Sequence, residues 1–481
     1  MKKIYILIAF ALTSLTVSAQ NLRTGYFLDG YSYRYQFNPA LQGERGFIAM
    51  PIFSQLSFGA ETSIAIKDFI YKTNSGTLAT FLHPDVSDAA VMKNLGHDAL
   101  ASANLDLNLF GLGFRAKKSY HTLDLSLKTH VDMTIPGDIF KFMKVGASDG
   151  NAVYNLSNLG ASANLYAQLA YGFSRRFKDK FNIGIRVKAL MGVASIRSDI
   201  NDLSLKMDKD QWVVNANGSA QFSSIPAKLI TGEDEDVLLN ELTSLYKAPN
   251  LGFAADLGFS VDVLKYLTIS ASILDLGFIG WNDTRIYSLA SEPWVYNGFD
   301  LSESETLDDQ FSSKLNELGE IFNFGEITPE VKSKYIQRLA MTVHAGIEAR
   351  LPFYERLSAG ILATHRFNGP HSWTEGRFSI NWALLRWLSF AANYAISDYG
   401  HSYGAAMNLH AKGFALFLGT DSFRPITSVS PNMIPLNELN TNIVIGANFP
   451  FGKYNGRFPK KVKDNTDDKN EKKEKSKKKK D

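Results

Sequence analysis

The feature that most constrains this chain is a recurring two-residue alternation of apolar and polar side chains. It is clearest at residues 123–133, which read LDLSLKTHVDM. A period of two is that of a β-strand with one apolar face. Such patterns predict fourteen strands, at about residues 46–63, 100–116, 120–134, 157–174, 181–195, 250–263, 267–280, 338–351, 356–367, 374–384, 388–397, 402–409, 413–421 and 439–451.

The connections between these segments decide between two all-β architectures. In a soluble sandwich the polar face of a strand meets water, whereas in a membrane barrel it lines the lumen. After the second, fourth, sixth, eighth, tenth and twelfth segments the links are only a few residues, and after the first, third, fifth and seventh they are long. Short turns at one end and long loops at the other are typical of outer-membrane barrels. The predicted fold is therefore an all-β, transmembrane antiparallel barrel of about fourteen strands.

Composition supports the barrel and removes other classes. The mean hydropathy of −0.12 is too polar for a bundle of membrane helices but suits strands with one apolar face. The chain has no cysteine, which excludes disulfides and cysteine nucleophiles. Aromatic residues gather at the short turns and predict an interfacial girdle on the periplasmic side: Tyr120, Phe177, Phe181, Tyr266, Phe353, Tyr354, Trp382 and Trp387.

The two ends of the chain differ from the predicted barrel at 46–452. Residues 1–19 carry Lys2 and Lys3, a short apolar run and Val17-Ser18-Ala19, the pattern of a signal peptide that is removed before Gln20. Residues 20–45 are rich in Tyr and turn residues and are expected to form a plug at the periplasmic mouth. Residues 453–481 are expected to be a disordered periplasmic tail, since 459–481 hold eleven lysines against six acids. Without 459–481 the net charge is −2, so nucleic-acid binding by the barrel is not expected.

Strand parity predicts which side chains face the lumen. Leu125, Leu127, Ile183, Ile185 and Val187 are predicted to face lipid. The predicted lumen-facing residues are Asp124, Lys128, His130, Asp132, Arg186, Lys188, Asp256 and Glu348. His130 with Asp132, and His344 with Glu348, share a face, but isolated polar pairs are ordinary in a lumen, so no catalytic, cofactor or metal site is expected. The interpretation is that the protein is not an enzyme.

Three local features depart from regular alternation. Asp275 falls on the apolar parity of its strand, which suggests a bulge near the outer rim, and the segment 413–421 barely alternates. Residues 200–222 are compatible with an additional hairpin outside the membrane. Helical spacing in two long connections, at 238–246 and 307–322, predicts short helices that either cover the barrel mouth or bind a partner.

Several motifs resemble an uncharacterised Bacteroidota outer-membrane barrel family of the domain-of-unknown-function type. They are the residues 26–41 with Asn38-Pro39-Ala40, the Ala255-Asp256-Leu257-Gly258 strand, and the run from Ser272 to Trp281. The two Asp-Leu-Gly strands are also similar to those of FadL-type and PorV-like barrels. The resemblance implies a fourteen-stranded barrel, with Asn38, Pro39 and Ala40 in the plug by analogy with FadL-type proteins.

Two functions remain open at this point. In the first, an outer-membrane barrel passes a small hydrophobic or amphipathic solute past the plug. In the second, an occluded barrel is an envelope scaffold, or a protein-binding component of a secretion or gliding system. The expected surroundings are outer-membrane lipid and, depending on the function, a solute or envelope proteins. Fold alone does not choose between them.

Overall fold

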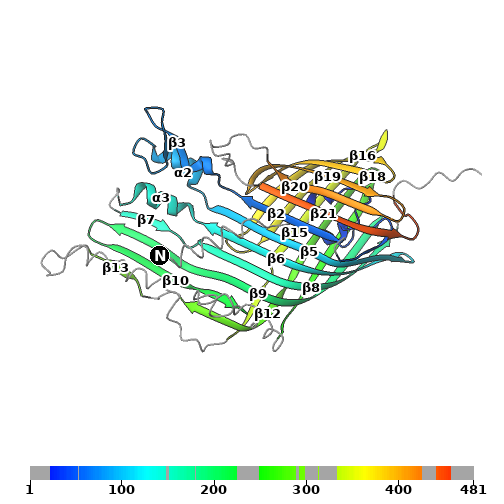
Figure 1. Cartoon of the computed structure of the whole chain (residues 1–481), viewed down its shortest axis with the longest axis horizontal. Helices are drawn as coiled ribbons and strands as arrows, with labels where there is room; N and C mark the ends of the chain where they lie inside the picture. The colour runs from blue at the N-terminus through cyan, green and yellow to red at the C-terminus, as the bar shows by residue number, and fades with distance from the viewer. Residues whose placement is uncertain are drawn as a thin grey trace, which may run out of the picture.

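The predicted segments form one closed sheet in a computed structural model that describes residues 22–51, 54–147, 151–178, 180–224, 249–288, 292–297, 313, 333–424 and 440–456 (Figure 1). The wall has fourteen antiparallel strand positions, which confirms the predicted fold. Its strands are β1 (Gly46–Ala49) with β2 (Gln55–Thr62), β5 (Ala99–Ala116), β6 (Ser119–Ile135), β8 (Gly160–Phe177), β9 (Phe181–Asp208), β11 (Asn250–Leu264), β12 (Leu267–Ser288), β15 (Met341–Leu351), β16 (Tyr354–Phe367), β17 (Trp373–Leu385), β18 (Leu388–Ser397), β19 (Gly400–His410), β20 (Ala415–Phe423) and β21 (Asn440–Phe451).

The barrel closes between its last and first strands. The strand β21 pairs with β1 through Gly46 and Phe451 and with β2 through Leu56 and Ile445, and both β1 and β2 then pair with β5. Consecutive wall strands are antiparallel, so the short turns lie at one end, the short-turn end, and the long connections at the other, the long-loop end. Closure leaves no free sheet edge in the wall, as hydrocarbon requires.

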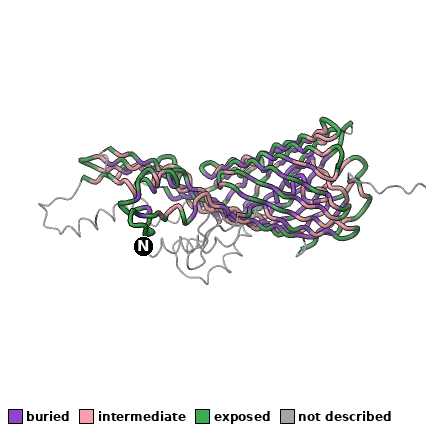
Figure 2. Tube along the Cα trace, turned by 90° about the horizontal axis from the view of Figure 1, so that it is seen from above, coloured by how far each residue is buried: buried purple, intermediate pink, exposed green. Residues whose placement is uncertain are grey.

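The two faces of the wall differ as strand parity predicts. Leu125, Ile183, Ile185 and Val187 are exposed on the outside, whereas Asp124 and Lys188 are buried. The same alternation of buried and exposed residues follows most wall strands (Figure 2). Most of the predicted aromatic girdle is exposed near the short turns, but the prediction is wrong for Tyr120. That side chain points inward, and its hydroxyl donates to the Arg45 carbonyl at 2.9 Å.

Several elements extend beyond the barrel at the long-loop end (Figure 1). The strand β9 continues past its barrel segment and forms a hairpin with β10 (Trp212–Ser223), which confirms the predicted extra hairpin. The short strands β7 (Asn151–Asn155) and β13 (Trp294–Tyr296) pair with β9 and β10, and β14 (Ser333–Arg338) pairs with β12 in line with β15. A separate hairpin joins β3 (Ile70–Lys72) and β4 (Leu78–Thr80).

Two helices accompany this extension, α2 (Asp88–Leu95) and α3 (Gly137–Val145). They lie in the connections after the first and third wall positions, where no helix was predicted. Ser87 caps α2, since its side-chain oxygen accepts from the Ala90 amide. The helices predicted at 238–246 and 307–322 lie outside the described residues, apart from residue 313. Within the described ranges, no helix combines the length and apolar character needed to cross a membrane.

Two irregularities of the ladder place polar side chains inside the barrel. Leu274 and Asp275 lie opposite the single residue Asp256, and Asp275 has a φ of +60°. This is the predicted bulge. In β20 the register with both neighbours shifts between Gly419 and Phe423, and both Asp421 and Ser422 are buried. The second irregularity explains why this segment barely alternates in sequence.

Candidate functional site

The N-terminal segment 22–45 lies inside the barrel, and we call it the inner segment. It contains two short 3-10 turns, η1 (Arg23–Gly25) and η2 (Arg34–Gln36), and its aromatic side chains form the core of the barrel. The ring of Tyr31 lies 5.0 Å from that of Phe417, and the ring of Tyr33 lies 5.4 Å from that of Phe47. The core of the barrel is therefore built between the inner segment and the wall.

Asn38, Pro39 and Ala40 dock on three neighbouring strands, β9, β11 and β12. The Asn38 amide donates to the carbonyls of Phe259 and Ala271, at 3.1 Å each. Its Oδ1 accepts from the Ala40 backbone amide at 2.9 Å, which holds the turn. This one side chain thus fixes both the local conformation of the inner segment and its position on the wall.

Glycines in the wall make room for this contact. A Cβ on Gly258 would lie 2.2 Å from Asn38 Oδ1, and a Cβ on Gly184 would lie 2.2 Å from the Pro39 carbonyl carbon. Glycine inside a strand often marks the close approach of another backbone. Further wall glycines meet the inner segment in the same way, namely Gly346 and Gly360 at Phe27, Gly404 at Thr24 and Gly419 at Leu22. The inner surface of the wall is shaped to fit this segment.

The start of the described inner segment is held near the long-loop end by a carboxylate. Asp421 accepts from the backbone amides of Arg23 and Thr24, at 2.6 Å each, and from the Thr24 hydroxyl at 2.7 Å. The Arg23 guanidinium lies 3.4 Å from Glu375 and 3.5 Å from Glu61. These groups are buried, so the interactions are weakly screened by solvent.

Arg377 completes this anchor. It donates to both oxygens of Glu375 at 3.0 Å and to the Asp421 backbone carbonyl at 2.9 Å. We did not predict Asp421, Glu375, Arg377 or Glu61 from the sequence. Glu375 and Arg377 could have been predicted to point into the lumen together, because two charged residues spaced by two in a strand share one face.

Four predicted lumen residues meet in one charged network on the opposite wall. Arg186 bridges Asp124 and Asp256, and its distance to Asp256 is 3.2 Å. Lys188 Nζ lies 2.6 Å from Asp256 and 2.6 Å from Asp275. The Asp275 backbone amide also donates to Asp256 at 2.8 Å. The bulge therefore brings a carboxylate inward that parity alone would place on the outside.

The other predicted lumen residues lie apart from this network. Lys128 pairs with Asp106 at 2.5 Å, and Asp132 accepts from Ser102 at 2.8 Å. His130 lines the central cavity, whereas Glu348 lines a separate space at the short-turn end. The structure therefore does not bring all eight residues together. Among the described residues, no group of three or more metal-ligating side chains is found.

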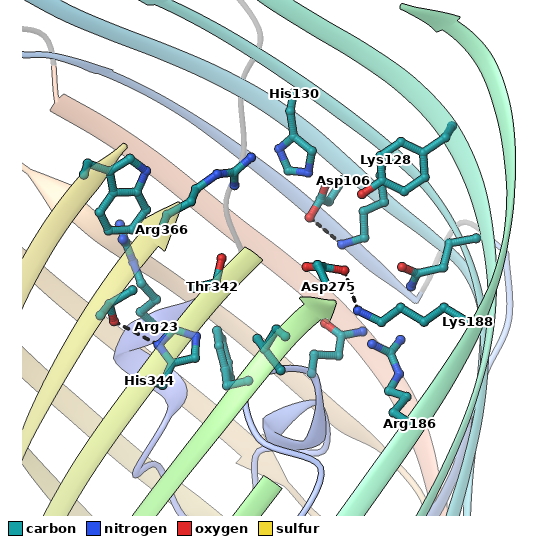
Figure 3. Close-up of a pocket in the computed structure, with 17 residues that line it drawn as sticks. Arg23, Asp106, Lys128, His130, Arg186, Lys188, Asp275, Thr342, His344 and Arg366 are labelled. Atoms are coloured by element: carbon teal, nitrogen blue, oxygen red, sulfur yellow. Dashed lines mark hydrogen bonds and ion pairs between the residues drawn. The ribbon is translucent and has the colours of Figure 1, made fainter. Parts of the chain in front are cut away.

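A polar cavity lies between the charged network and the inner segment (Figure 3). The space open to the centres of water molecules is about 90 Å³. Since one water needs roughly 10–15 Å³ on this measure, the cavity has room for several. A second space of about 640 Å³ opens at the short-turn end and is lined in part by Tyr26 and Phe27. The inner segment contributes to the walls of both spaces.

The connection between β16 and β17 crosses the long-loop end of the lumen. Asn368 donates to Asp132 at 2.9 Å, and the Pro370 carbonyl accepts from the Thr134 hydroxyl at 3.1 Å. His371 is hydrogen-bonded to the same hydroxyl at 2.7 Å, and burial lowers the pKa of its imidazole. The partners of this connection, Asp132 and Thr134, both belong to β6, on the far side of the barrel. We call residues 368–372 the crossing loop.

The structure is similar to solved membrane barrels at low sequence identity. The toluene transporter TodX of Pseudomonas putida is 8% identical with a TM-score of 0.38, over 86% of this chain and 93% of that one. The toluene transporter TbuX of Ralstonia pickettii is 9% identical with a TM-score of 0.41, over 88% and 95%. A FadL homologue of Pseudomonas aeruginosa is 11% identical with a TM-score of 0.36, over 91% and 99%.

No curated protein matches the chain. Residues 39–421 match one protein family, whose description is "Family of unknown function (DUF5723)". This agrees with the resemblance to a family of the domain-of-unknown-function type. The matched region contains thirteen of the fourteen wall positions in full or in part, together with the Asn38-Pro39-Ala40 site from Pro39 onward. Because the match covers well over half of its length, the chain belongs to the DUF5723 family of unknown function.

Proposed function

We propose that the protein is an outer-membrane channel for a small amphipathic solute, which the inner segment closes by filling the lumen. The observation that carries the proposal is the fit between segment and wall: glycines give it room, and Asn38 and Asp421 hold it. It lies between a cavity that admits water and a wide mouth at the short-turn end. Passage requires this segment to move.

The exposed outer face of the barrel supports a membrane location. Apolar side chains such as Leu169, Ile183, Ile361 and Phe378 are exposed along the wall. Aromatic side chains are exposed near the short turns, including Phe353, Trp382 and Trp387. An apolar band with an aromatic border suits a bilayer and its interface. Short turns then face the periplasm, and the extension with α2 and α3 faces outward.

The lining of the central cavity favours an amphipathic solute over a pure hydrocarbon. Its wall includes Lys128, Lys188 and Arg366 together with His130 and Asp275 (Figure 3). Moving a hydrocarbon through such a lining would strip water from charged groups without replacing their contacts, which is costly. A solute with a polar group can replace those waters.

A reversible disulfide tests whether the inner segment is a gate. The chain has no cysteine, so an engineered pair forms without competition. A Cβ on Gly404 would lie 2.8 Å from Thr24 Oγ1, close enough for a bond in Thr24→Cys/Gly404→Cys once the Asn393 amide, 2.4 Å from that Cβ, moves aside. In planar bilayers we expect low conductance for the oxidised pair and higher conductance after reduction. Each single cysteine variant is the control and should not respond to reductant.

A second candidate, an envelope scaffold, is favoured by the outer extension. The α2 region exposes several large apolar side chains, including Ile66, Leu78 and Leu82. If the disulfide pair conducts equally in both redox states, the inner segment is not a gate. If removal of residues 22–36 also leaves a folded, non-conducting barrel, the scaffold replaces the channel.

A further inference from the structure

The central cavity has an uneven distribution of charge between its surface and the residues behind that surface. Among the described residues, five cations line it, namely Arg23, Lys128, Arg186, Lys188 and Arg366, and two carboxylates do, Asp106 and Asp275. The carboxylates of Asp124 and Asp256 pair with two of these cations, Arg186 and Lys188, but do not line the space. The surface that a solute meets is therefore richer in positive charge than the network as a whole.

Arg366 has the weakest ion pairing of these cations. Its ion pair with Asp132 is long, 3.9 Å, and Asp132 also accepts hydrogen bonds from Ser102 and Asn368. Its Nε is buried and has no hydrogen-bond partner within the described ranges. A buried donor without a partner destabilises the folded protein, so a ligand that accepts from it is bound more tightly.

Six further polar atoms belong to residues that line the same space and are buried without a hydrogen-bond partner in the described part of the chain. They are Arg23 Nε and Nη1, Arg186 Nε, Trp373 Nε1, His130 Nδ1 and Asp106 Oδ1, of which four are N–H donors of Arg or Trp. In the close-up, Arg366 extends from β16 toward His130 and Asp106, and Lys128 and Lys188 approach from the opposite wall (Figure 3). Donors and positive charges thus converge on the cavity from several strands.

We propose that this cavity binds an oxyanion, a carboxylate or phosphate group, and that Arg366 is its main ligand. The planar guanidinium offers parallel N–H donors that match two oxygens of such a group. Lys128 and Lys188 add positive charge from the other wall. The cavity has room for several waters, the volume that a compact anionic group needs. This inference rests on the proposed function, since it names the polar group of the solute.

The test is a binding measurement that does not depend on transport. The full chain is purified in a non-ionic detergent and a Tris chloride buffer and titrated calorimetrically with inorganic phosphate and, separately, octanoate. Wild type should bind at least one of them at millimolar concentration or below. Binding of phosphate alone indicates a free phosphate or phosphate ester, and binding of octanoate alone indicates a carboxylate headgroup.

Variants connect the binding to Arg366. Arg366→Gln should weaken it at least tenfold, and Arg366→Lys should weaken it less, because it keeps the charge but not the paired donors. Arg424→Gln is the matched control, since Arg424 is an arginine of intermediate burial that donates to the His401 carbonyl and does not line the cavity. Heat-modified migration on gels checks that each barrel is folded. If Arg366→Gln does not fold, Arg366→Lys carries the test.

Two results would overturn the site. One is that neither anion binds wild type, and the other is that Arg366→Gln, or Arg366→Lys where the former does not fold, binds as tightly as wild type. Both are independent of conductance. The disulfide pair can still show gated conductance when no anion binds, and an anion can bind to a barrel that never conducts, so failure of this site and failure of the proposed function are distinguishable.

Discussion

Removal of one charge, by Lys188→Met, tests whether the lumen network is structural. Strand parity alone places Lys188 in a water-filled lumen, where a substitution should change the folding stability little. In the structure Lys188 is 3% exposed and lies 2.6 Å from both Asp256 and Asp275. Its loss leaves the buried carboxylate of Asp256 and the partly exposed carboxylate of Asp275 with too little positive charge. Breaking a buried ion pair on one side costs about 3–5 kcal/mol.

The two carboxylates do not share this cost equally. Asp256 keeps Arg186 at 3.2 Å, whereas Lys188 is the cation nearest to Asp275. Neutralising Asp275 should therefore restore most of the stability that Lys188→Met removes. We expect Lys188→Met/Asp275→Asn to recover about 1–3 kcal/mol relative to Lys188→Met, the range of coupling between residues in contact.

The assay is urea unfolding in lipid vesicles, followed by tryptophan fluorescence and by heat-modified migration on gels. Lys118→Met is the control, because this exposed lysine lies in the turn between β5 and β6 and should change stability by less than about 0.5 kcal/mol. The reasoning is refuted if Lys188→Met costs less than about 1 kcal/mol. It is also refuted if the double variant is no more stable than the single one.

Other changes test the outer face, the fit of the inner segment, its anchor and the tail. Ile185→Arg, on the exposed face of β9, should lower stability by about 2–4 kcal/mol in the same unfolding assay, and a cost near zero would mean that this face does not meet lipid. Gly258→Leu should displace Asn38 and raise conductance while the barrel still migrates as folded, and unchanged conductance would contradict the docking role of Asn38. Asp421→Ala should increase proteolysis of residues 22–36, and protection equal to wild type would show that other contacts hold the segment. Truncation after Gly456 should leave folding unchanged and remove salt-sensitive binding to anionic envelope material, whereas binding that persists would exclude the lysine-rich tail as its cause.

The wall of this barrel was predictable because its signal is local. A strand that faces lipid on one side and a polar interior on the other must alternate along its own sequence. Thus the segments around β6, β16 and β17 were found within a few residues of their observed bounds. The Asp275 bulge was also found, because one charged residue on the apolar parity is itself a local conflict.

The helices α2 and α3 were missed for a physical reason. Each is eight or nine residues long, too short to be stable alone, and it forms where packing supports it. Val91 and Leu95 of α2 pack in one cluster with Phe81 and with Phe140 of α3. Such helices depend on contacts between separate connections, which the spacing of apolar residues in one connection does not reveal.

The sequence of the wall strands predicts the position of the inner segment better than the sequence of the segment itself does. Residues 22–45 have no strand or helix periodicity, and Thr24 meets Asp421 across 397 positions of the chain. Gly184 and Gly258, however, lie on the inner parity of predicted strands, beside Lys188 and Asp256. Inward glycines at two neighbouring strands indicate that something presses against the wall there.

Strand geometry also explains why the anchor residue Asp421 lies in β20, the strand with the least regular alternation. A regular strand presents every second residue to the lumen, so two adjacent residues cannot both point inward. The register shift in β20 allows it: Asp421 binds the backbone of the inner segment, while its neighbour Ser422 donates to Glu61. The shift that concentrates two polar groups at one point is also what erases the alternation from the sequence. When one strand of an otherwise regular barrel lacks the apolar–polar alternation, a segment bound inside the lumen is therefore the first explanation to test.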